Sequence, residues 1–277
     1  MGPRLPALLA LAIPVLAGLA YLWFFDAPRF YVTINGAGLA LGMLVIALLP
    51  QIKHLRLRRI VTLVLLALLF LPLATGPFLN GIARWLPLGP LSLHAGMFAG
   101  PLLVLLAARD EDYAPPILLG AILAASFQPD AGTGFLLTFA TIGLYNATRD
   151  WKIGVVAGTA FFASLVMVVR GELPAQPFVE RVLVESAMVQ PLAALGLLAA
   201  LLASFFIMLH AIAARTPVRH ALAGSLFGLT VASVLSNYPS ALIGYGAAPI
   251  LGYALALSQC RVIERAQNEA CSAPQAP

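Results

Sequence analysis

Long apolar segments alternate with short polar connections along almost the whole chain. A run of about 20 apolar residues is enough to cross a bilayer as a helix. The pattern therefore predicts an all-α polytopic membrane protein, a bundle of about ten transmembrane helices. The ten segments lie at about 5–25, 30–50, 60–79, 94–108, 115–128, 132–147, 153–169, 189–212, 220–236 and 246–259.

The same pattern predicts the domain organisation. Residues 1–259 are expected to form a single transmembrane domain, and the polar residues 260–277 are expected to form a disordered cytoplasmic tail. The fifth, sixth and tenth segments are short. Short segments are tolerated where they end inside the protein, so we expect their ends to surround a shared cavity.

The composition strengthens the membrane prediction and removes one function class. Hydrophobic residues make up 61% of the 277 residues and charged residues only 10%, with a mean hydropathy of +0.95, which is outside the range of soluble domains. A net charge of +5 would also suit a nucleic-acid-binding protein. The Lys and Arg residues fall in alternate connections, however, as membrane insertion requires, so no nucleic-acid partner is expected.

The distribution of positive charge predicts the orientation. The connection at 51–59 carries Lys53, Arg56, Arg58 and Arg59, which places it in the cytoplasm. Alternating the remaining connections from there puts twelve Lys and Arg residues inside and four outside. We therefore expect both termini to be cytoplasmic.

The stretch 128–134 is a compact polar group between two apolar segments. Pro129 disfavours helix at Gln128, and Asp130 stands where the N-cap of a helix beginning at Ala131 would stand. Its carboxylate would lie at the positive end of that helix, and Gly132 would let backbone approach a bound group. This suits a site for a polar head group or a phosphate-linked metal, and a plain helix cap is the alternative.

Outer connections supply further candidate residues. Residues 80–93 mix turn-forming and apolar types, which suits a stretch on the bilayer surface, with Trp85 as an interfacial anchor. Arg84 either grips a lipid phosphate or is ion-paired or extended to the interface. His94, which begins the next segment, is expected to be a satisfied polar residue at a helix start.

Two later outer stretches are also notable. Residues 178–185 predict an amphipathic helix in which Arg181 and Glu185, four residues apart, can pair. A simple surface helix and a substrate contact are both open there. The irregular Gly-Tyr-Gly sequence at 244–246 predicts non-helical backbone that lines a cavity or is covered by protein. The sequence has no zinc signature, nucleotide-binding glycine pattern or nucleophile elbow.

Three outer stretches together resemble the SEDS family of the RodA and FtsW type. The resemblance covers roughly residues 75–258, and the stretches follow in the family's order on the corresponding helices. They are Asn80-Gly81 with Arg84-Trp85, then Gln128-Pro129-Asp130 with Gly132-Thr133, then Pro239 ahead of Tyr245-Gly246.

The resemblance implies a multi-pass protein of the bacterial inner membrane. SEDS proteins polymerise an undecaprenyl-pyrophosphate-linked precursor, lipid II, together with a class B penicillin-binding protein. It implies no cofactor except a possible divalent cation, and besides that precursor and partner it implies contact with membrane lipids. The candidate catalytic residues are Asp130 and Glu185, and no protein metal site is assigned. The candidate substrate-binding residues are Arg84, Trp85, Gln128, Gly132, Thr133, Glu180, Arg181 and Tyr245.

The sequence also departs from the family. Residues 94–97 read His-Ala-Gly-Met and position 100 is Gly, where the family has Gln-Pro-Ser-Glu followed by Lys. In the shortened loop before the eighth segment, Pro177 stands where the family has a catalytically important Asp. Three hypotheses therefore remain open: a divergent polymerase, a non-catalytic regulator or scaffold for a penicillin-binding protein, and a small secondary transporter with Asp130 as an ion or proton site.

Overall fold

The computed structural model describes residues 4–89 and 91–260. All ten predicted segments are helical, and one short helix precedes the eighth of them. The elements are α1 (Leu5–Phe24), α2 (Arg29–Leu48), α3 (Leu55–Thr75), β1 (Trp85–Leu88), β2 (Leu91–His94), α4 (Ala95–Ala107), α5 (Ala114–Phe127), α6 (Ala131–Thr148), α7 (Trp151–Arg170), α8 (Val182–Val189), α9 (Pro191–Phe206), the π-helical turn η1 (Ile207–Ala211), α10 (Thr216–Leu235) and α11 (Ala247–Ser258).

Six of the described helices are long and apolar enough to cross a membrane: α1, α2, α3, α7, α9 with η1, and α10. Helices α4, α5 and α11 are shorter apolar helices. The structure therefore confirms the predicted all-α polytopic membrane protein. The predicted tail, apart from Cys260, lies outside the described residues.

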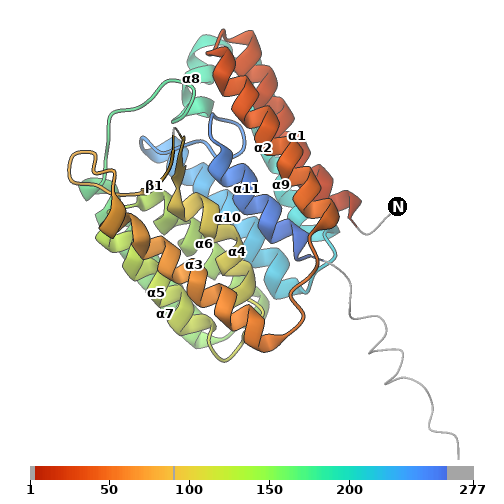
Figure 1. Cartoon of the computed structure of the whole chain (residues 1–277), viewed down its shortest axis with the longest axis vertical. Helices are drawn as coiled ribbons and strands as arrows, with labels where there is room; N and C mark the ends of the chain where they lie inside the picture. The colour runs from red at the N-terminus through yellow and green to blue at the C-terminus, as the bar shows by residue number, and fades with distance from the viewer. Residues whose placement is uncertain (1–3, 90, 261–277) are drawn as a thin grey trace, which may run out of the picture.

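Helices α4, α6, α10 and α11 form the centre of the bundle (Figure 1). Twelve of the thirteen residues of α4 are buried, which explains why this helix is apolar on every side. Helices α3, α5 and α7 pack on one side of this centre, and α1, α2 and α9 pack on the other. The most extensive contact is between α6 and α10.

Glycines allow α6 and α10 to approach so closely. A Cβ atom on Gly143 of α6 would lie 2.2 Å from the carbonyl oxygen of His220. A Cβ atom on Gly228 of α10 would lie 2.1 Å from the carbonyl oxygen of Phe135. Small residues at a helix–helix contact let backbones pack directly, which is a main source of association energy within a bilayer.

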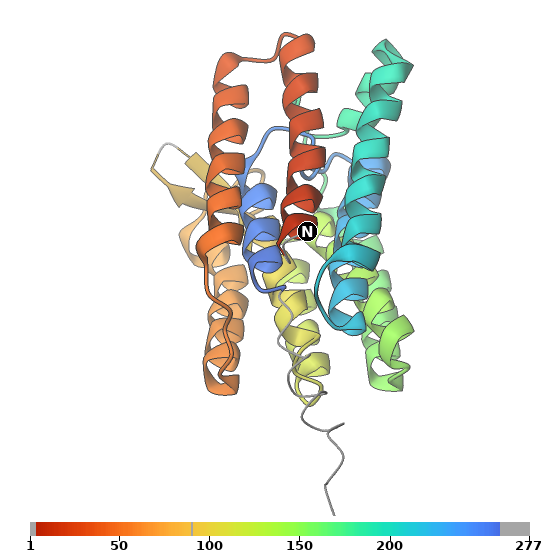
Figure 2. The same cartoon turned by 90° about the vertical axis from the view of Figure 1, so that its right-hand side faces the viewer.

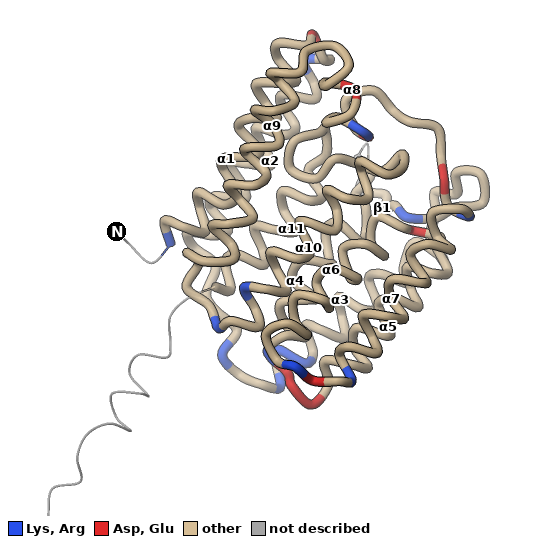
Figure 3. The backbone as a smooth tube through the Cα atoms, turned by 180° about the vertical axis from the view of Figure 1, so that it is seen from behind, with Lys and Arg blue, Asp and Glu red and all other residues tan. Residues whose placement is uncertain are grey.

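Most of the basic residues gather at one end of the bundle, the end that carries the connection between α2 and α3 (Figure 3). Helix α3 begins at Leu55, so the last part of the basic stretch is its first turn and not a loop. Arginine is a good helix former, and a helix can extend beyond the apolar layer. Arg59 Nε lies 2.7 Å from Asp110 Oδ2 after α4, which ties these two helix ends together. The cytoplasmic location of this end remains a prediction.

The outer stretch after α3 differs from the prediction of an irregular surface segment. It forms an antiparallel hairpin of β1 and β2 that projects from the side of the bundle (Figure 2). Trp85 pairs with His94 and Leu86 with Leu93. Alternating side chains on both arms suit a strand, and Gly89 at the turn has a φ of +61°, which glycine adopts readily. The hairpin delivers Arg84 and His94 to the same place, at the outer end of α4.

Candidate functional site

The junction between α5 and α6 is built as the sequence predicts. Helix α5 ends at Phe127, and Asp130 is the N-cap of α6. One carboxylate oxygen accepts a hydrogen bond from the Thr133 backbone N–H at 3.1 Å, and the other accepts one from the Thr133 hydroxyl. These contacts satisfy donors that every helix start leaves unpaired. Gly132 is required next to the cap, because a Cβ atom there would lie 2.9 Å from the ring of Tyr238.

The environment of Asp130 differs from the expected solvated cavity. The residue is only 1% exposed, and its Oδ2 atom lies 3.6 Å from Nε2 of His94, itself 5% exposed. His94 is the N-cap of α4, and its Nδ1 atom accepts a hydrogen bond from the Met97 N–H at 3.4 Å. An accepting Nδ1 in a neutral imidazole places the proton on Nε2, which faces the carboxylate. His94 is therefore a member of this cluster and more than a simple cap.

The sequence contains one signal for this approach. A Cβ atom on Gly96 would lie 1.6 Å from the Thr133 hydroxyl oxygen, so only glycine lets α4 come this close to the start of α6. The position two residues after His94 thus sets the distance between His94 and Asp130. Helix periodicity alone does not identify such a pair.

Arg84 is buried and cannot grip an exposed lipid phosphate. It is 2% exposed, and its Nη2 atom donates to the carbonyl oxygens of Pro129, at 2.7 Å, and of Gly171. Its guanidinium carbon lies 4.9 Å from the ring centre of Tyr238, in a cation–π contact. The side chain binds the α5–α6 junction to the end of α7, because a planar fork of donors suits several carbonyl acceptors at once.

Tyr238 completes this cluster, although the sequence reasoning did not single it out. Its side chain is fully buried, and its hydroxyl oxygen accepts a hydrogen bond from the Ala131 N–H at 3.0 Å. The same hydroxyl lies 3.3 Å from the carbonyl oxygen of Gly171, to which it donates. Burial raises the pKa of Tyr238 to about 12, so the phenol stays neutral and available as a donor.

Gln128 and Trp85 flank the cluster on its two sides. Gln128 is 3% exposed, and its side-chain amide donates to the carbonyl oxygen of Leu69 in α3. The partly exposed indole of Trp85 meets the His94 ring edge-on, with 6.2 Å between ring centres. Of these two predicted substrate contacts, only Trp85 presents surface from which a ligand could be reached.

The loop after α7 differs from the predicted amphipathic helix. The helix begins only at Val182, because Phe178 and Arg181 have φ values of +65° and +53°, which an α-helix does not allow. Within the described residues Arg181 and Glu185 form no ion pair. The predicted pairing is therefore wrong, and α8 spans Val182–Val189 instead.

Residues 178–180 instead pair with the stretch that follows α10. The Ser240 N–H donates to the Val179 carbonyl at 2.8 Å, and the Tyr245 N–H donates to the Phe178 carbonyl at 2.7 Å. Glu180 and Pro239 form an isolated β-bridge. These backbone bonds explain how the irregular segment at 239–245 is satisfied without helix.

Glu180 is a carboxylate of this region whose pKa is shifted toward neutrality. Burial raises its pKa to about 7, while the Gln176 N–H and the positive charge of Arg84 oppose that rise and Glu185 adds to it. The residue is only partly buried, so water and a polar ligand can reach it. A base with a pKa near the working pH is suited to proton transfer.

Tyr245 lies on the other side of the same loop. Its ring stacks on Tyr31 of α2, with 3.8 Å between ring centres and 8° between the planes. Asn35 of α2 donates to the Gly244 carbonyl at 2.9 Å and accepts from the Gly246 N–H at 3.0 Å. Asn35 is fully buried and was missed at the level of sequence, where it is one polar residue in an apolar segment.

The predicted residues thus form two neighbouring groups. The first is a buried polar cluster, formed by Arg84, Gln128, Asp130, Gly132 and Thr133 together with His94 and Tyr238. The second is the more accessible loop layer, formed by Glu180, Arg181, Glu185 and Tyr245. Arg84 connects them, because its charge acts on Glu180. Across residues 4–89 and 91–260, no three or more His, Cys, Asp or Glu side chains form a group that could hold a metal ion.

Solved structures identify the arrangement of helices. The rod shape-determining protein RodA of Thermus thermophilus superposes with a TM-score of 0.67 at 20% sequence identity, over 91% of this chain and 93% of that one. The chain has the RodA fold. A structure described as coordinating polymerization and crosslinking in a peptidoglycan synthase complex matches with a TM-score of 0.62 at 21% identity, over 90% of this chain and 95% of that one.

The RodA similarity is one of structure and not of close sequence. No protein-family model matches the chain, and no match is found among curated proteins. The alignment nevertheless spans nearly the whole of both chains, so the similarity concerns the fold of the chain as a whole and not one part of it.

Proposed function

We propose that the chain is a divergent, shortened SEDS protein of bacterial cell-wall synthesis, located in the inner membrane. We infer that it binds an undecaprenyl-pyrophosphate-linked precursor such as lipid II on its periplasmic side. The observation that carries the proposal is the RodA fold over 91% of the chain. The polar residues quoted for the family resemblance also meet at one end of the bundle, around Arg84 and Asp130.

Glu180 is the residue best placed to act as a base in polymerisation. The acceptor sugar hydroxyl would attack the anomeric carbon of a second precursor, forming a glycosidic C–O bond and breaking the C–O bond to pyrophosphate. The hydroxyl proton would pass to the Glu180 carboxylate, and the undecaprenyl pyrophosphate would leave as an anion. Its partial exposure and a pKa of about 7 favour Glu180 over the buried Asp130.

The role of Asp130 in this proposal is structural. Its oxygens are engaged by Thr133 and face His94, so it holds the start of α6 in position. Glu185 lies one helical turn after Arg181 and contributes negative charge near Glu180. It is a second candidate for a contact with the sugar or with a cation.

A non-catalytic scaffold is the second candidate function. Two observations favour it: Pro177 replaces the family's loop Asp, and Asp130 is withdrawn from solvent. A scaffold of this kind would still bind a polyprenyl-linked lipid and a class B penicillin-binding protein. The partner is suggested by the solved structure of a peptidoglycan synthase complex with the same fold.

The experiment uses the purified full chain with lipid II, with and without a candidate class B penicillin-binding protein. Glycan strands that form with the wild type and are lost in Glu180→Gln would support the polymerase proposal. Glu172→Gln is the matched control, because Glu172 is an exposed carboxylate in the same loop. Adding a chelator to the same reaction tests the predicted divalent cation.

The other outcomes are equally informative. Lipid II binding without polymerisation would replace the polymerase by the scaffold. Absence of lipid II binding, together with sodium- or proton-dependent uptake into vesicles that Asp130→Asn abolishes, would overturn both in favour of a transporter.

A further inference from the structure

Glu180, the base of the proposed polymerisation, lies in a turn that does not hold its own shape. Two residues of this turn, Phe178 and Arg181, have φ values of +65° and +53°. This is the left-handed region, which residues with a Cβ atom rarely adopt. Such backbone persists only where the surrounding structure holds it in place. The position of Glu180 therefore depends on contacts from outside residues 178–181.

The segment 239–245 supplies the nearest of these contacts. Its backbone N–H groups donate to two carbonyl oxygens of the turn, at 2.7 and 2.8 Å. The Ser240 hydroxyl accepts from the N–H of Val182, the first residue of α8, at 3.0 Å. Gly244 lets the two stretches approach, because a Cβ atom there would lie 2.8 Å from the Val179 carbonyl oxygen. A displacement of 239–245 would therefore move the turn as well.

One side chain of a membrane helix binds the end of this irregular segment. Asn35 of α2 is fully buried. Its amide nitrogen donates to the Gly244 carbonyl at 2.9 Å, and its amide oxygen accepts from the Gly246 N–H at 3.0 Å. A residue of a neighbouring parallel strand would bind the same two backbone groups, a carbonyl and the N–H two residues later. The Asn35 side chain thus takes the place of a strand that the fold lacks.

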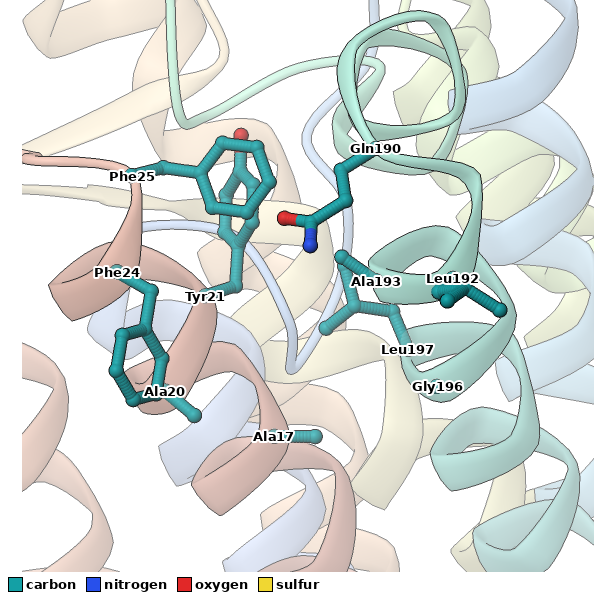
Figure 4. Close-up of a pocket in the computed structure, with 10 residues that line it drawn as sticks. All are labelled: Ala17, Ala20, Tyr21, Phe24, Phe25, Gln190, Leu192, Ala193, Gly196 and Leu197. Carbon is teal, nitrogen blue, oxygen red and sulfur yellow. The ribbon is translucent and has the colours of Figure 1, made fainter.

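Aromatic contacts hold the same region from α1 and α2. Tyr31 of α2 stacks on Tyr245, with 3.8 Å between ring centres. Tyr21 of α1 lies 6.0 Å from Phe178, measured between ring centres. Figure 4 shows Tyr21 beside Phe25 at the outer end of α1. Stacked rings tolerate small displacements, whereas hydrogen bonds weaken steeply with distance and angle, so the amide of α2 fixes the segment most closely.

We propose that Asn35 is a positioning residue, which holds 239–245 in the register that places the Glu180 carboxylate at the substrate. This inference rests on the proposed function, because Glu180 is the base of that reaction. Asn35 is fully buried, so it acts through the backbone of 244–246 and not by touching substrate. A buried amide in a membrane helix is costly unless its polar atoms are paired, and here both pair with this one segment.

The test follows the Glu180 carboxyl directly, by carbon NMR of the full chain in detergent, with its signal assigned through Glu180→Gln. Burial raises the pKa of Glu180 to about 7. In Asn35→Leu two backbone groups of 244–246 lose their partner, so the turn should loosen and the midpoint should move from about 7 toward the ordinary 4.5. Ser204→Ala is the matched control, since it removes another buried hydrogen bond, from α9 to the Ala10 carbonyl, and it should leave the Glu180 midpoint unchanged.

A second variant keeps the test decisive if Asn35→Leu does not fold. Gly244→Ala leaves Asn35 in place but puts a Cβ atom 2.8 Å from the Val179 carbonyl oxygen, and it should move the Glu180 midpoint in the same direction. Equal midpoints in the wild type and a folded Asn35→Leu would overturn the proposal. If Asn35→Leu does not fold, equal midpoints in the wild type and Gly244→Ala would overturn it.

Kinetics with lipid II give an independent readout. Asn35→Leu should lower kcat roughly 10- to 100-fold with little change in KM, because a small misplacement of a catalytic group slows its reaction by about that factor. Asn35→Gln keeps the amide and should recover part of the rate. Failure of the proposed polymerase would abolish glycan strands in every variant, the wild type included. Failure of the positioning role would instead leave kcat and the Glu180 midpoint equal in the wild type and Asn35→Leu.

Discussion

The Nε2 atom of His94 lies 3.6 Å from the Oδ2 atom of Asp130, and both side chains are almost completely buried. The two residues are the N-caps of α4 and α6, so this relationship joins two helix starts in the centre of the bundle. Ionisable groups at such positions are costly unless they have polar partners. The outer ends of α4 and α6 therefore depend on each other.

Two substitutions distinguish the contribution of Asp130 as a helix cap from the contribution of its negative charge. Asp130→Ala removes the acceptors of both Thr133 hydrogen bonds and should lower the free energy of unfolding by about 1–3 kcal/mol. Asp130→Asn retains an acceptor and should cost less. Thermal unfolding in detergent measures both variants. Equal losses would show that capping is not what the side chain contributes.

The His94–Asp130 contact predicts an energetic coupling. A double-mutant cycle with His94→Asn and Asp130→Asn should give an interaction of about 0.5–3 kcal/mol, because the two side chains are in contact. The control cycle pairs His94→Asn with Lys152→Gln, since Lys152 lies in the first turn of α7 at the other end of the bundle. Additive effects in both cycles would contradict the coupling.

Arg84 should be difficult to replace even by lysine. Arg84→Met leaves the carbonyls of Pro129 and Gly171 without their buried donor, which should cost about 2–5 kcal/mol. Arg84→Lys keeps the charge but loses the planar fork, so we expect an intermediate loss. Arg170→Met, on an exposed side chain at the end of α7, should change stability by less than about 0.5 kcal/mol. Similar melting temperatures for all three variants would show that the hydrogen bonds of Arg84 to Pro129 and Gly171 contribute little to stability.

The raised pKa of Glu180 predicts that the rate of polymerisation rises with pH, whereas the stability of the fold falls with pH. As a base with a pKa of about 7, it should let polymerisation rise by about tenfold between pH 6 and pH 8. Its pKa in the fold is raised from an ordinary value of 4.5, so the fold favours the protonated form. Its contribution to stability is therefore present below pH 4.5 and is lost as pH rises through 7. Glu180→Gln should flatten both profiles, and an unchanged melting profile would exclude the raised pKa.

The contact between α6 and α10 predicts strong intolerance to one methyl group. Gly228→Ala places a Cβ atom 2.1 Å from the Phe135 carbonyl oxygen, so the helices must separate, at a cost of about 1–3 kcal/mol. Gly158→Ala faces open space and should be neutral or slightly stabilising. Unfolding in detergent compares the stability of the two variants. A Gly228→Ala variant as stable as the wild type would mean that the close packing of α6 and α10 contributes little to stability.

The fold was largely predictable because hydrophobic periodicity depends on local sequence. All ten apolar segments are helical, and the N-cap at Asp130 is where Pro129 and the following glycines place it. The hairpin was not predicted, since strands of four residues are shorter than the window in which alternation is recognisable. The start of α8 was misplaced because residues 178–181 carry an amphipathic pattern while their backbone pairs with a distant segment.

The composition of the buried polar cluster was less predictable than the fold. Arg84, Gln128, Asp130, Gly132 and Thr133 were named from the sequence, and the structure brings them together. Their burial was not predicted, because exposure depends on how α4 and the hairpin cover the α5–α6 junction. His94 was expected at a helix start, where it caps α4, but its contact with Asp130 was not predicted. Tyr238 and Asn35 were missed since their partners are far away in sequence, as with Asn35 and Gly244.

Arg84 also has a mechanical consequence. Arg84 directly precedes the hairpin, and its guanidinium group donates to the turn between α5 and α6 and to Gly171, which follows the end of α7. The side chain thus holds these three chain segments together. Moving any one of these three chain segments outward alone would therefore break hydrogen bonds of a buried guanidinium, which is costly. An opening at this end of the bundle is therefore expected on the far side of the loop layer, where the Tyr31–Tyr245 stack is the contact to be separated.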